Sequence, residues 1–216
     1  MTMIHIRRWT PLLLSIFGLA TIGSLTVYQL LGISDYGSRV LTWSGALLYI
    51  IWLIWESRIS IQETQNLEEY HDQGTLELAA ITKYVLLFAC LLGGFQFNHP
   101  RGILGIIFMV LGIGIRAKAI LQLGDKYSHR IRLPTLPLRT KAPYSWIRHP
   151  AYLGTALAHT GVVLIFYNSF SWAVLVLWYF CIYLRVHVED RLLIAKLPEY
   201  REYAVQVTWK LIPGLW

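Results

Sequence analysis

Charged residues are scarce in this 216-residue chain: Asp, Glu, Lys and Arg make up 14%, whereas soluble domains average about 25%. Hydrophobic residues make up 56%. This composition excludes an ordinary soluble domain and indicates a polytopic membrane protein. A full span needs about 20 residues, so three of the six readable apolar segments, the second, fifth and sixth, are short. The six cover residues 11–31, 39–55, 79–97, 102–121, 151–167 and 170–185.

The chain also lacks the motifs of several common sites. Its two cysteines, Cys90 and Cys181, lie within expected spans and form no CxxC pair, which favours packed thiols. The histidines are scattered without HxxxH spacing, so we expect no metal site. No GxSxG, Walker or Rossmann glycine pattern is present. A nucleotide-like cofactor would therefore need a site of another kind.

Acidic residues are outnumbered by basic ones, 12 to 19. If all six segments span, both termini lie on one side of the membrane, together with 16 of the 19 basic residues. The exceptions are Arg39, Lys83 and Arg101. The positive-inside rule then predicts that both termini are cytoplasmic. Because the basic residues flank apolar helices, we expect no nucleic-acid partner.

The connections between the expected spans give the organisation of the chain. Residues 56–78 are polar and mostly acidic, and they predict a cytoplasmic loop. The short turn at 97–102 predicts that the third and fourth spans are antiparallel neighbours. Asn168 and Ser169, a turn-forming pair, predict a tight hairpin of the last two spans. Small residues in the fourth span indicate close helix packing, and they are Gly102, Gly105, Gly112 and Gly114.

The longest irregular segment, 122–150, contains four prolines, which forbid a long helix. In so small a membrane protein we expect such a loop to fold over something. After the hairpin, apolar residues at helical spacing with charges between them predict an amphipathic cytoplasmic helix over 188–203, interrupted near Pro198.

Two polar clusters flank the hairpin. Tyr144, Arg148 and His149 precede it, and Arg185 and Glu189 follow it. A hairpin brings both clusters to one membrane face, where charged groups mark a site for a polar ligand more often than a packing device. Two simpler interpretations stay open. In the first, Arg148 and His149 are basic anchors at the membrane interface. In the second, Arg185 and Glu189, four residues apart, form an intrahelical ion pair worth about 0.3–0.5 kcal/mol.

His159 lies seven residues after Tyr152, on the same helix face and well inside the bilayer. A neutral histidine that is hydrogen-bonded to a neighbour is the simpler interpretation, and a substrate contact is the alternative. Pro150 favours an extended backbone at His149 and a helix that begins at the proline.

Several short motifs, in order from about residue 46 onward, resemble the isoprenylcysteine carboxyl methyltransferase family in its shorter, prokaryotic-type branch. Each is weak alone, but their order and spacing together are specific. They are Trp52-x-x-x-Glu56, His71-Asp-Gln-Gly-Thr75, Gly112-Ile-Gly-Ile-Arg116 with Ala119-Ile-Leu-Gln-Leu-Gly124, Pro143-Tyr144, Arg148-His-Pro-Ala-Tyr-Leu-Gly154, Arg185-x-x-x-Glu189-Asp190, Tyr200-x-x-Tyr203 and Ile212-Pro213. The first apolar segment lies outside the matched part.

The resemblance implies an all-α membrane bundle of about six transmembrane helices. It also implies S-adenosylmethionine as methyl donor, bound at the cytoplasmic face under the loop before the fifth helix. By resemblance, Arg185 holds the substrate carboxylate and acts with Glu189 in catalysis, and His159 is a second candidate substrate contact. The residues expected at the cofactor are Leu136, Leu138, Tyr144, Arg148, His149, Pro150, Ala151, Tyr152 and Glu189.

The chain departs from the family pattern in the cofactor-contacting stretch. The His and Val usual there are replaced by Leu136 and Arg139, and the Gly of Gly-x-Tyr is Ala142. The Phe-Gly that usually precedes Tyr200 is replaced by Leu197-Pro198. The motif around Arg148 is intact, so these changes bear on cofactor contacts and on the identity of the acceptor.

These features predict a single domain over 1–216, with an additional N-terminal helix at 1–38, a helical scaffold at 39–121 and a catalytic region at 122–216. The predicted function is S-adenosylmethionine-dependent methylation, most directly carboxyl O-methylation of an isoprenylcysteine-like or other lipophilic acceptor, with S-adenosylhomocysteine as product. The expected partners are the lipid bilayer and that acceptor. A carboxylate is ionised at neutral pH, so the site must supply orientation and exclude water rather than provide a base.

Two alternatives stay open. The end of the chain, Leu211-Ile-Pro-Gly-Leu-Trp216, resembles that of membrane sterol reductases, which would make the protein an NADPH-dependent oxidoreductase. The other alternative is a non-catalytic membrane subunit, in which the charged cluster is structural.

Overall fold

Helices make up all the regular secondary structure of the residues that the computed structural model describes, which are 35–65, 71–92, 98–134 and 136–216 with isolated positions from 13 to 33. The elements are α2 (Tyr36–Gln65), α3 (Thr75–Leu92), α4 (His99–Leu123), the 3-10 turn η1 (Gly124–Lys126), α5 (Pro150–Ile165), α6 (Ser169–Lys196) and α7 (Pro198–Gln206). The expected all-α class is confirmed. The expected helix at 1–38 lies mostly outside the described residues.

Three described helices are long and apolar enough to cross a membrane: Tyr36–Ile61, His99–Lys126 and Ser169–Lys196. A fourth apolar helix, α5, is shorter. Large apolar side chains on the outer faces of these helices are exposed, as suits contact with lipid rather than water. They include Leu47, Ile51, Ile107, Leu111, Val176 and Phe180. The number of spans beyond these three stays a prediction.

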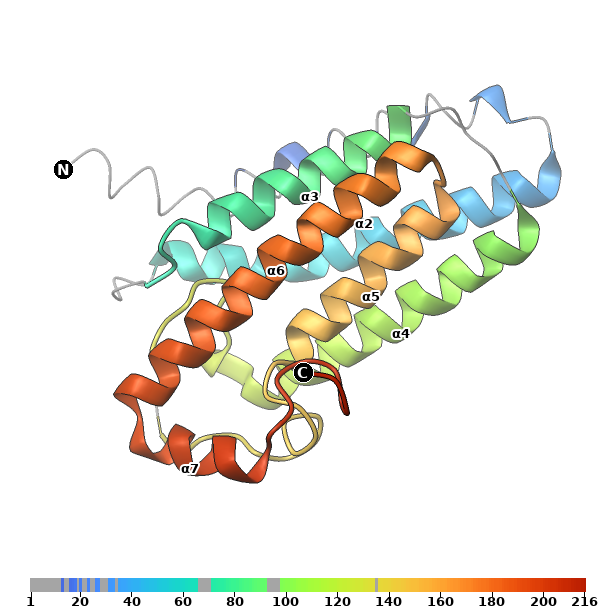
Figure 1. Ribbon diagram of the computed structural model, residues 1–216. Helices are drawn as coiled ribbons and strands as arrows, with labels where there is room; N and C mark the ends of the chain where they lie inside the picture. The colour runs from blue at the N-terminus through green and yellow to red at the C-terminus, as the bar shows by residue number, and fades with distance from the viewer. Residues whose placement is uncertain are drawn as a thin grey trace.

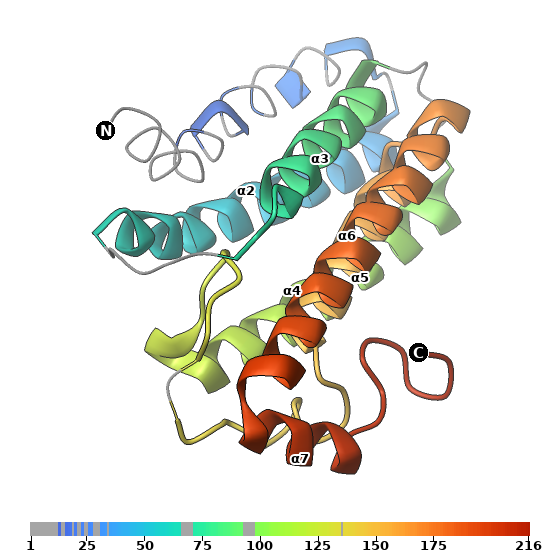
Figure 2. The same cartoon turned by 60° about the vertical axis from the view of Figure 1, so that its left-hand side comes forward.

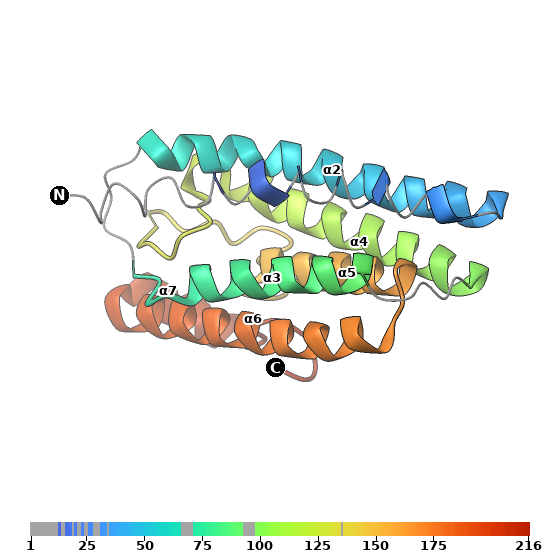
Figure 3. The same ribbon diagram turned by 90° about the horizontal axis from the view of Figure 1, so that it is seen from above.

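The long helices run side by side, and α7 lies across one end of the bundle (Figure 1). Figure 3 shows α2 and α4 along one edge and α6 along the other, with α5 between them. The segment from Tyr127 to His149, drawn in yellow in Figures 1 and 2, returns to the end of the bundle where α6 leads into α7. The predicted loop thus covers one end of the bundle.

The tightest packing joins α4 to α5, where glycines of one helix face the backbone of the other. A Cβ at Gly105 would lie 2.7 Å from the carbonyl oxygen of Gly161, and one at Gly154 would lie 2.6 Å from the nitrogen of Arg116. Backbones can approach this closely only without side chains between them. The packing role expected for Gly105 and Gly112 is confirmed, and it fixes Arg116 of α4 against α5.

The prediction that the third and fourth spans are neighbours is wrong. Helix α3 packs chiefly against α6, whereas α4 packs against α5 and α2. The glycine contacts pack α4 closely against α5, and α3 packs against α6 instead. Helices α2 and α3, although consecutive, make no extensive contact over their described residues.

The boundaries of two predicted polar segments are also wrong. No Gly or Pro interrupts the chain between Glu56 and Gln65, so α2 continues through the first part of the expected loop at 56–78. The expected amphipathic helix over 188–203 is not separate, because α6 continues to Lys196. Its break at Pro198 is confirmed, and α7 begins there.

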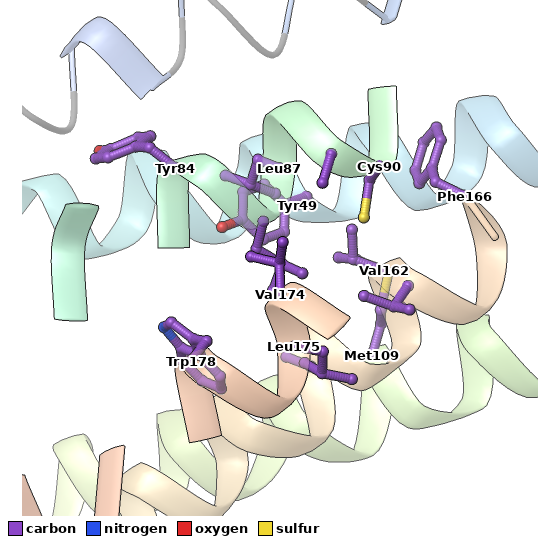
Figure 4. Packing of buried hydrophobic residues seen from close by; sticks show 14 of the residues in the cluster. Tyr49, Tyr84, Leu87, Cys90, Met109, Val162, Phe166, Val174, Leu175 and Trp178 are labelled. Atoms are coloured by element: carbon purple, nitrogen blue, oxygen red, sulfur yellow. The ribbon is translucent and has the colours of Figure 1, made fainter. Parts of the chain in front are cut away.

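The predicted hairpin of the last two spans is confirmed. The side chain of Asn168 accepts a hydrogen bond of 2.8 Å from the Ser171 N–H, and Ser171 in turn accepts from the Asn168 N–H, so α6 begins with a capping box. The main core lies inside the bundle, where α3, α5 and α6 contribute Leu87, Val162 and Leu175 (Figure 4). Cys90 and Cys181 are both buried free thiols, as predicted.

Candidate active site

A cavity of about 260 Å³ runs from the interior of the bundle to the loop and helix that cover its end. Its inner half is lined by residues well inside the long helices, and these are Tyr49, Trp52, Lys83, Tyr84, His159 and Trp178. Its outer half is lined by the covering loop, the adjoining ends of α5 and α6, and α7. The residues there are Leu138, Tyr144, Arg148, His149, Tyr152, Arg185, Glu189, Tyr200 and Tyr203.

Most of the predicted site residues therefore meet at one cavity. Ala151 also lines it, but Pro150 and Leu136 do not. Pro150 begins α5, as predicted, and is buried behind the site. The side chain of Leu136 is 47% exposed. Leu138 packs beside the buried cluster of Leu193, Tyr200 and Tyr203. Of the two leucines expected at the cofactor, therefore, only Leu138 lies at the cavity.

Arg148 lines the cavity but is tied chiefly to the protein. Its guanidinium pairs with Asp190 through contacts of 2.9 and 3.1 Å and donates to the carbonyl oxygens of Ala204, Val207 and Thr208. The Arg148 backbone N–H also donates to the carbonyl of Trp209. The arginine of the motif thus holds the C-terminal segment against the start of α5, and its expected contact with the cofactor stays a prediction.

His149 and Glu189 face each other across the outer half. His149 is buried, with Nε2 3.4 Å from Asp190 and Nδ1 3.9 Å from Glu189. Tyr152 donates a hydrogen bond of 2.8 Å to Glu189. The side chain of Glu189 remains 26% exposed, which leaves part of its carboxylate open to the cavity.

Arg185 lies at the junction of the two halves and does not pair with Glu189 or Asp190. It donates to the His129 carbonyl at 2.7 Å, to Tyr152 at 3.3 Å, and to Asp72 and Thr75 at 3.4 Å each. The simpler interpretation, an intrahelical ion pair with Glu189, is therefore wrong. Asp72, which precedes α3, is the carboxylate that faces this arginine.

A second ion pair separates the two halves. Arg116 of α4 pairs with Glu56 of α2 and also donates to Thr155 of α5 at 2.7 Å. Glu56 accepts a further hydrogen bond from the Trp52 indole. Three helices are thus joined by one buried network. Sequence reasoning assigned no role to Glu56, Arg116 or Asp72, although each stood in a quoted motif and the first two were charges in or beside apolar segments.

His159 is fully buried in the inner half. Its Nδ1 lies 2.9 Å from the Thr155 carbonyl and its Nε2 lies 3.1 Å from the Tyr49 hydroxyl, while the Trp178 ring is centred 4.5 Å away. Both ring nitrogens have protein partners, as the simpler interpretation requires. His159 also lines the cavity, so a substrate contact stays a proposal.

The phenols of the outer half stay neutral. Burial raises the pKa of Tyr144, Tyr200 and Tyr203 well above the usual value of a phenol. Burial also raises the pKa of Asp72, and Arg185 and Arg130 oppose that rise. Tyr200 donates to Asp190 and Tyr203 donates to the Tyr144 carbonyl, so these rings stand in fixed positions. The described residues contain no group of three metal-ligating side chains.

Comparison with known protein families identifies the region that contains most of these residues. Residues 105–195, from the middle of the α4 glycine face to the end of α6, match the model of the isoprenylcysteine carboxyl methyltransferase (ICMT) family. This region belongs to the ICMT family. The resemblance found in the motifs is thereby confirmed over this region. No significant match to a curated protein was found.

The matched region contains most of the site. It includes Arg116, the covering loop, His149 and both Arg185 and Glu189, whereas α7 lies beyond it. The inner half is completed by α2 and α3, which lie before the matched region and contribute Tyr49, Trp52, Lys83 and Tyr84. The ICMT match therefore covers more of the outer half than of the inner half.

Proposed function

We propose that the protein transfers a methyl group from S-adenosylmethionine to the carboxylate of a lipophilic acceptor. The observation that supports this most is one cavity with two unlike halves, in a chain whose α4–α6 region is of the ICMT family. The outer half is polar and aromatic, whereas the inner half lies between apolar helices. A polar methyl donor and an apolar acceptor need such a combination.

The residues of the outer half fit the methyl donor. Its sulfonium and amino groups are cationic, and Glu189 offers a partly exposed carboxylate. Tyr144, Tyr200 and Tyr203 supply neutral aromatic rings, which suit both a cation and a flat base. We assign cofactor binding to these residues together with His149, Ala151, Tyr152 and Leu138. Arg148 is assigned to holding the outer half together.

S-adenosylmethionine supplies an electrophilic methyl group. The acceptor carboxylate is already ionised near neutral pH, so the chain needs no general base. What its side chains must do is orient one carboxylate oxygen and keep water out. The covering loop and α7 shield the outer half, and the rings of Trp52 and Trp178 line the inner half with apolar surface.

Arg185 is the residue we assign to orienting the acceptor. A guanidinium has five N–H groups, and four partners already face this one. The contacts to Asp72 and Thr75, at 3.4 Å, are longer than ordinary hydrogen bonds. A carboxylate would replace these two, since the 2.7 Å bond to His129 is the shortest of the four.

The test is titration of the purified full-length protein with S-adenosylhomocysteine and, separately, with NADPH. The proposal expects saturable binding of S-adenosylhomocysteine at micromolar concentration and none of NADPH. Binding of NADPH alone would support an oxidoreductase instead. Binding of neither by folded protein would favour a non-catalytic subunit, and either result would overturn the proposal.

A further inference from the structure

Lys83 is the one positive charge of the inner half that belongs to no ion pair among the described residues. It lies on α3, more than two helical turns beyond Thr75, and lines the cavity. The contact of its ammonium is with a neutral ring: Nζ lies 4.9 Å from the centre of the Tyr84 ring. An ammonium inside an apolar bundle is costly unless an anion accompanies it.

The neighbouring charges do not supply that anion. Lys83 interacts electrostatically with Glu56, but Glu56 is bonded to Arg116 and to Trp52. Asp72, at the start of α3, faces Arg185 and Arg130 instead. Both of these carboxylates are therefore matched by an arginine, and neither forms an ion pair with Lys83.

The surroundings of Lys83 suit the apolar part of an acceptor. Tyr49, Leu53, Ala79, Tyr84 and Trp178 line the cavity beside it. Figure 4 shows Tyr49, Tyr84 and Trp178 coming from three different helices. The lining beside Lys83 thus combines aliphatic and aromatic side chains, which suit an alkyl or isoprenoid chain.

We propose that Lys83 makes the inner half selective for an acid: its ammonium attracts the carboxylate of the lipophilic acceptor as it enters the cavity, and Arg185 then orients that carboxylate for the reaction. This inference rests on the proposed function, in which the acceptor is a lipophilic carboxylate. It also adds a specificity-determining residue from α3, outside the part of the chain matched by the ICMT family.

The same charge favours release of the product. In the transfer, a carboxylate oxygen forms a bond to the methyl carbon, the carbon–sulfur bond breaks, and its electron pair stays on sulfur. An anion and a sulfonium cation thus become a neutral ester and a neutral thioether. Lys83 then faces an ester that no longer neutralises it, so the inner half binds the product more weakly than the acid.

The experiment measures binding of farnesoic acid, its methyl ester and farnesol to the full-length protein in nanodiscs at pH 8, where the acid is ionised. The wild-type protein should bind the acid at least about tenfold more tightly than the ester or the alcohol, as a charge-assisted hydrogen bond implies. Lys83→Met should lose most of that preference, with Arg185 alone supplying the remainder, whereas Lys83→Arg should keep most of it. Lys118→Met, an exposed lysine of α4, is the matched control and should behave as wild type.

Equal binding of acid and ester by the wild-type protein would overturn the inference without any variant. So would an unchanged preference in folded Lys83→Met. Titration with S-adenosylhomocysteine on the same samples keeps the two proposals apart. A preference for the acid without S-adenosylhomocysteine binding would overturn the proposed function and leave an acid-selective lipid site, whereas the reverse result would overturn the role of Lys83 alone.

Discussion

The two halves of the cavity differ in how completely their polar groups are satisfied within the protein. In the outer half, Arg148 and Asp190 are paired, Tyr200 is bonded to Asp190, and Glu189 accepts from Tyr152. In the inner half, the Lys83 ammonium lies over the Tyr84 ring and belongs to no ion pair among the described residues. The outer half is thus fixed before any ligand arrives, whereas the inner half is electrostatically complete only with an anion in it.

The difference suggests a division of labour between segments of the chain. The outer half is built largely by α5, α6 and the covering loop, most of which the ICMT match includes. The inner half depends on α2 and α3, which precede the match. We infer that the outer half carries what the family shares, the methyl donor, and that the inner half carries what distinguishes this chain, its acceptor.

The largest expected effect comes from breaking the network between the halves. Arg116→Ala would leave Glu56 buried without its arginine and would also remove the bond to Thr155, so we expect a loss of about 3–5 kcal/mol in the free energy of unfolding. Chemical unfolding in detergent measures it, and Lys118→Ala on the same helix is the control. An Arg116→Ala protein as stable as this control would show that the network is dispensable.

A smaller effect is expected at Arg148. Replacement by Lys keeps the charge but cannot span both Asp190 oxygens and the three carbonyls, so we expect a loss of about 1–3 kcal/mol. Because those carbonyls belong to residues 204–208, limited proteolysis should cut the C-terminal segment faster. Unchanged proteolysis together with weaker S-adenosylhomocysteine binding would make Arg148 a cofactor ligand instead.

Arg185→Lys tests the junction of the halves. The lysine keeps the charge but loses the planar fork, so we expect turnover of a prenylcysteine-type acid to fall about tenfold. Affinity for S-adenosylhomocysteine should stay near that of the wild type, since cofactor binding is assigned to other residues. Full activity in this variant would remove Arg185 from the orienting role, and loss of cofactor affinity would place it in the outer half's ligand set.

The orientation of the halves is open to a test that leaves the site intact. The distribution of basic residues predicts that the C-terminus, and with it the outer half, faces the cytoplasm. A phosphatase or fluorescent reporter fused after Trp216 should therefore report a cytoplasmic position. An extracytoplasmic reading would invert the predicted topology.

Much of the outer half was predictable from the sequence because its residues are close together along the chain. A hairpin of two apolar helices necessarily returns Glu189 to the level of His149, and the structure places them 3.9 Å apart at their nearest atoms. Pro150 fixed the start of α5 for a local reason as well, since proline is tolerated at the first turn of a helix.

The inner half was not predictable in the same way, because it depends on which helices pack together. A short turn suggested that α3 would lie beside α4, but the glycine faces of α4 and α5 determine the packing. The partners Glu56 and Arg116 are 60 residues apart, and Asp72 and Arg185 are 113 apart. Charge within or beside an apolar segment was the signal that could have singled out Glu56 and Arg116, but only the fold could pair them.

The central claim, that the outer half binds the methyl donor, is tested most directly by calorimetric titration of S-adenosylhomocysteine into the wild-type protein, Glu189→Ala, His149→Ala and Lys83→Met. We expect binding by the wild type, a loss of about 1.5–3 kcal/mol in binding free energy for each of the two outer-half variants, and unchanged affinity for Lys83→Met. Unchanged affinity in both outer-half variants, with the proteins folded, would contradict the assignment.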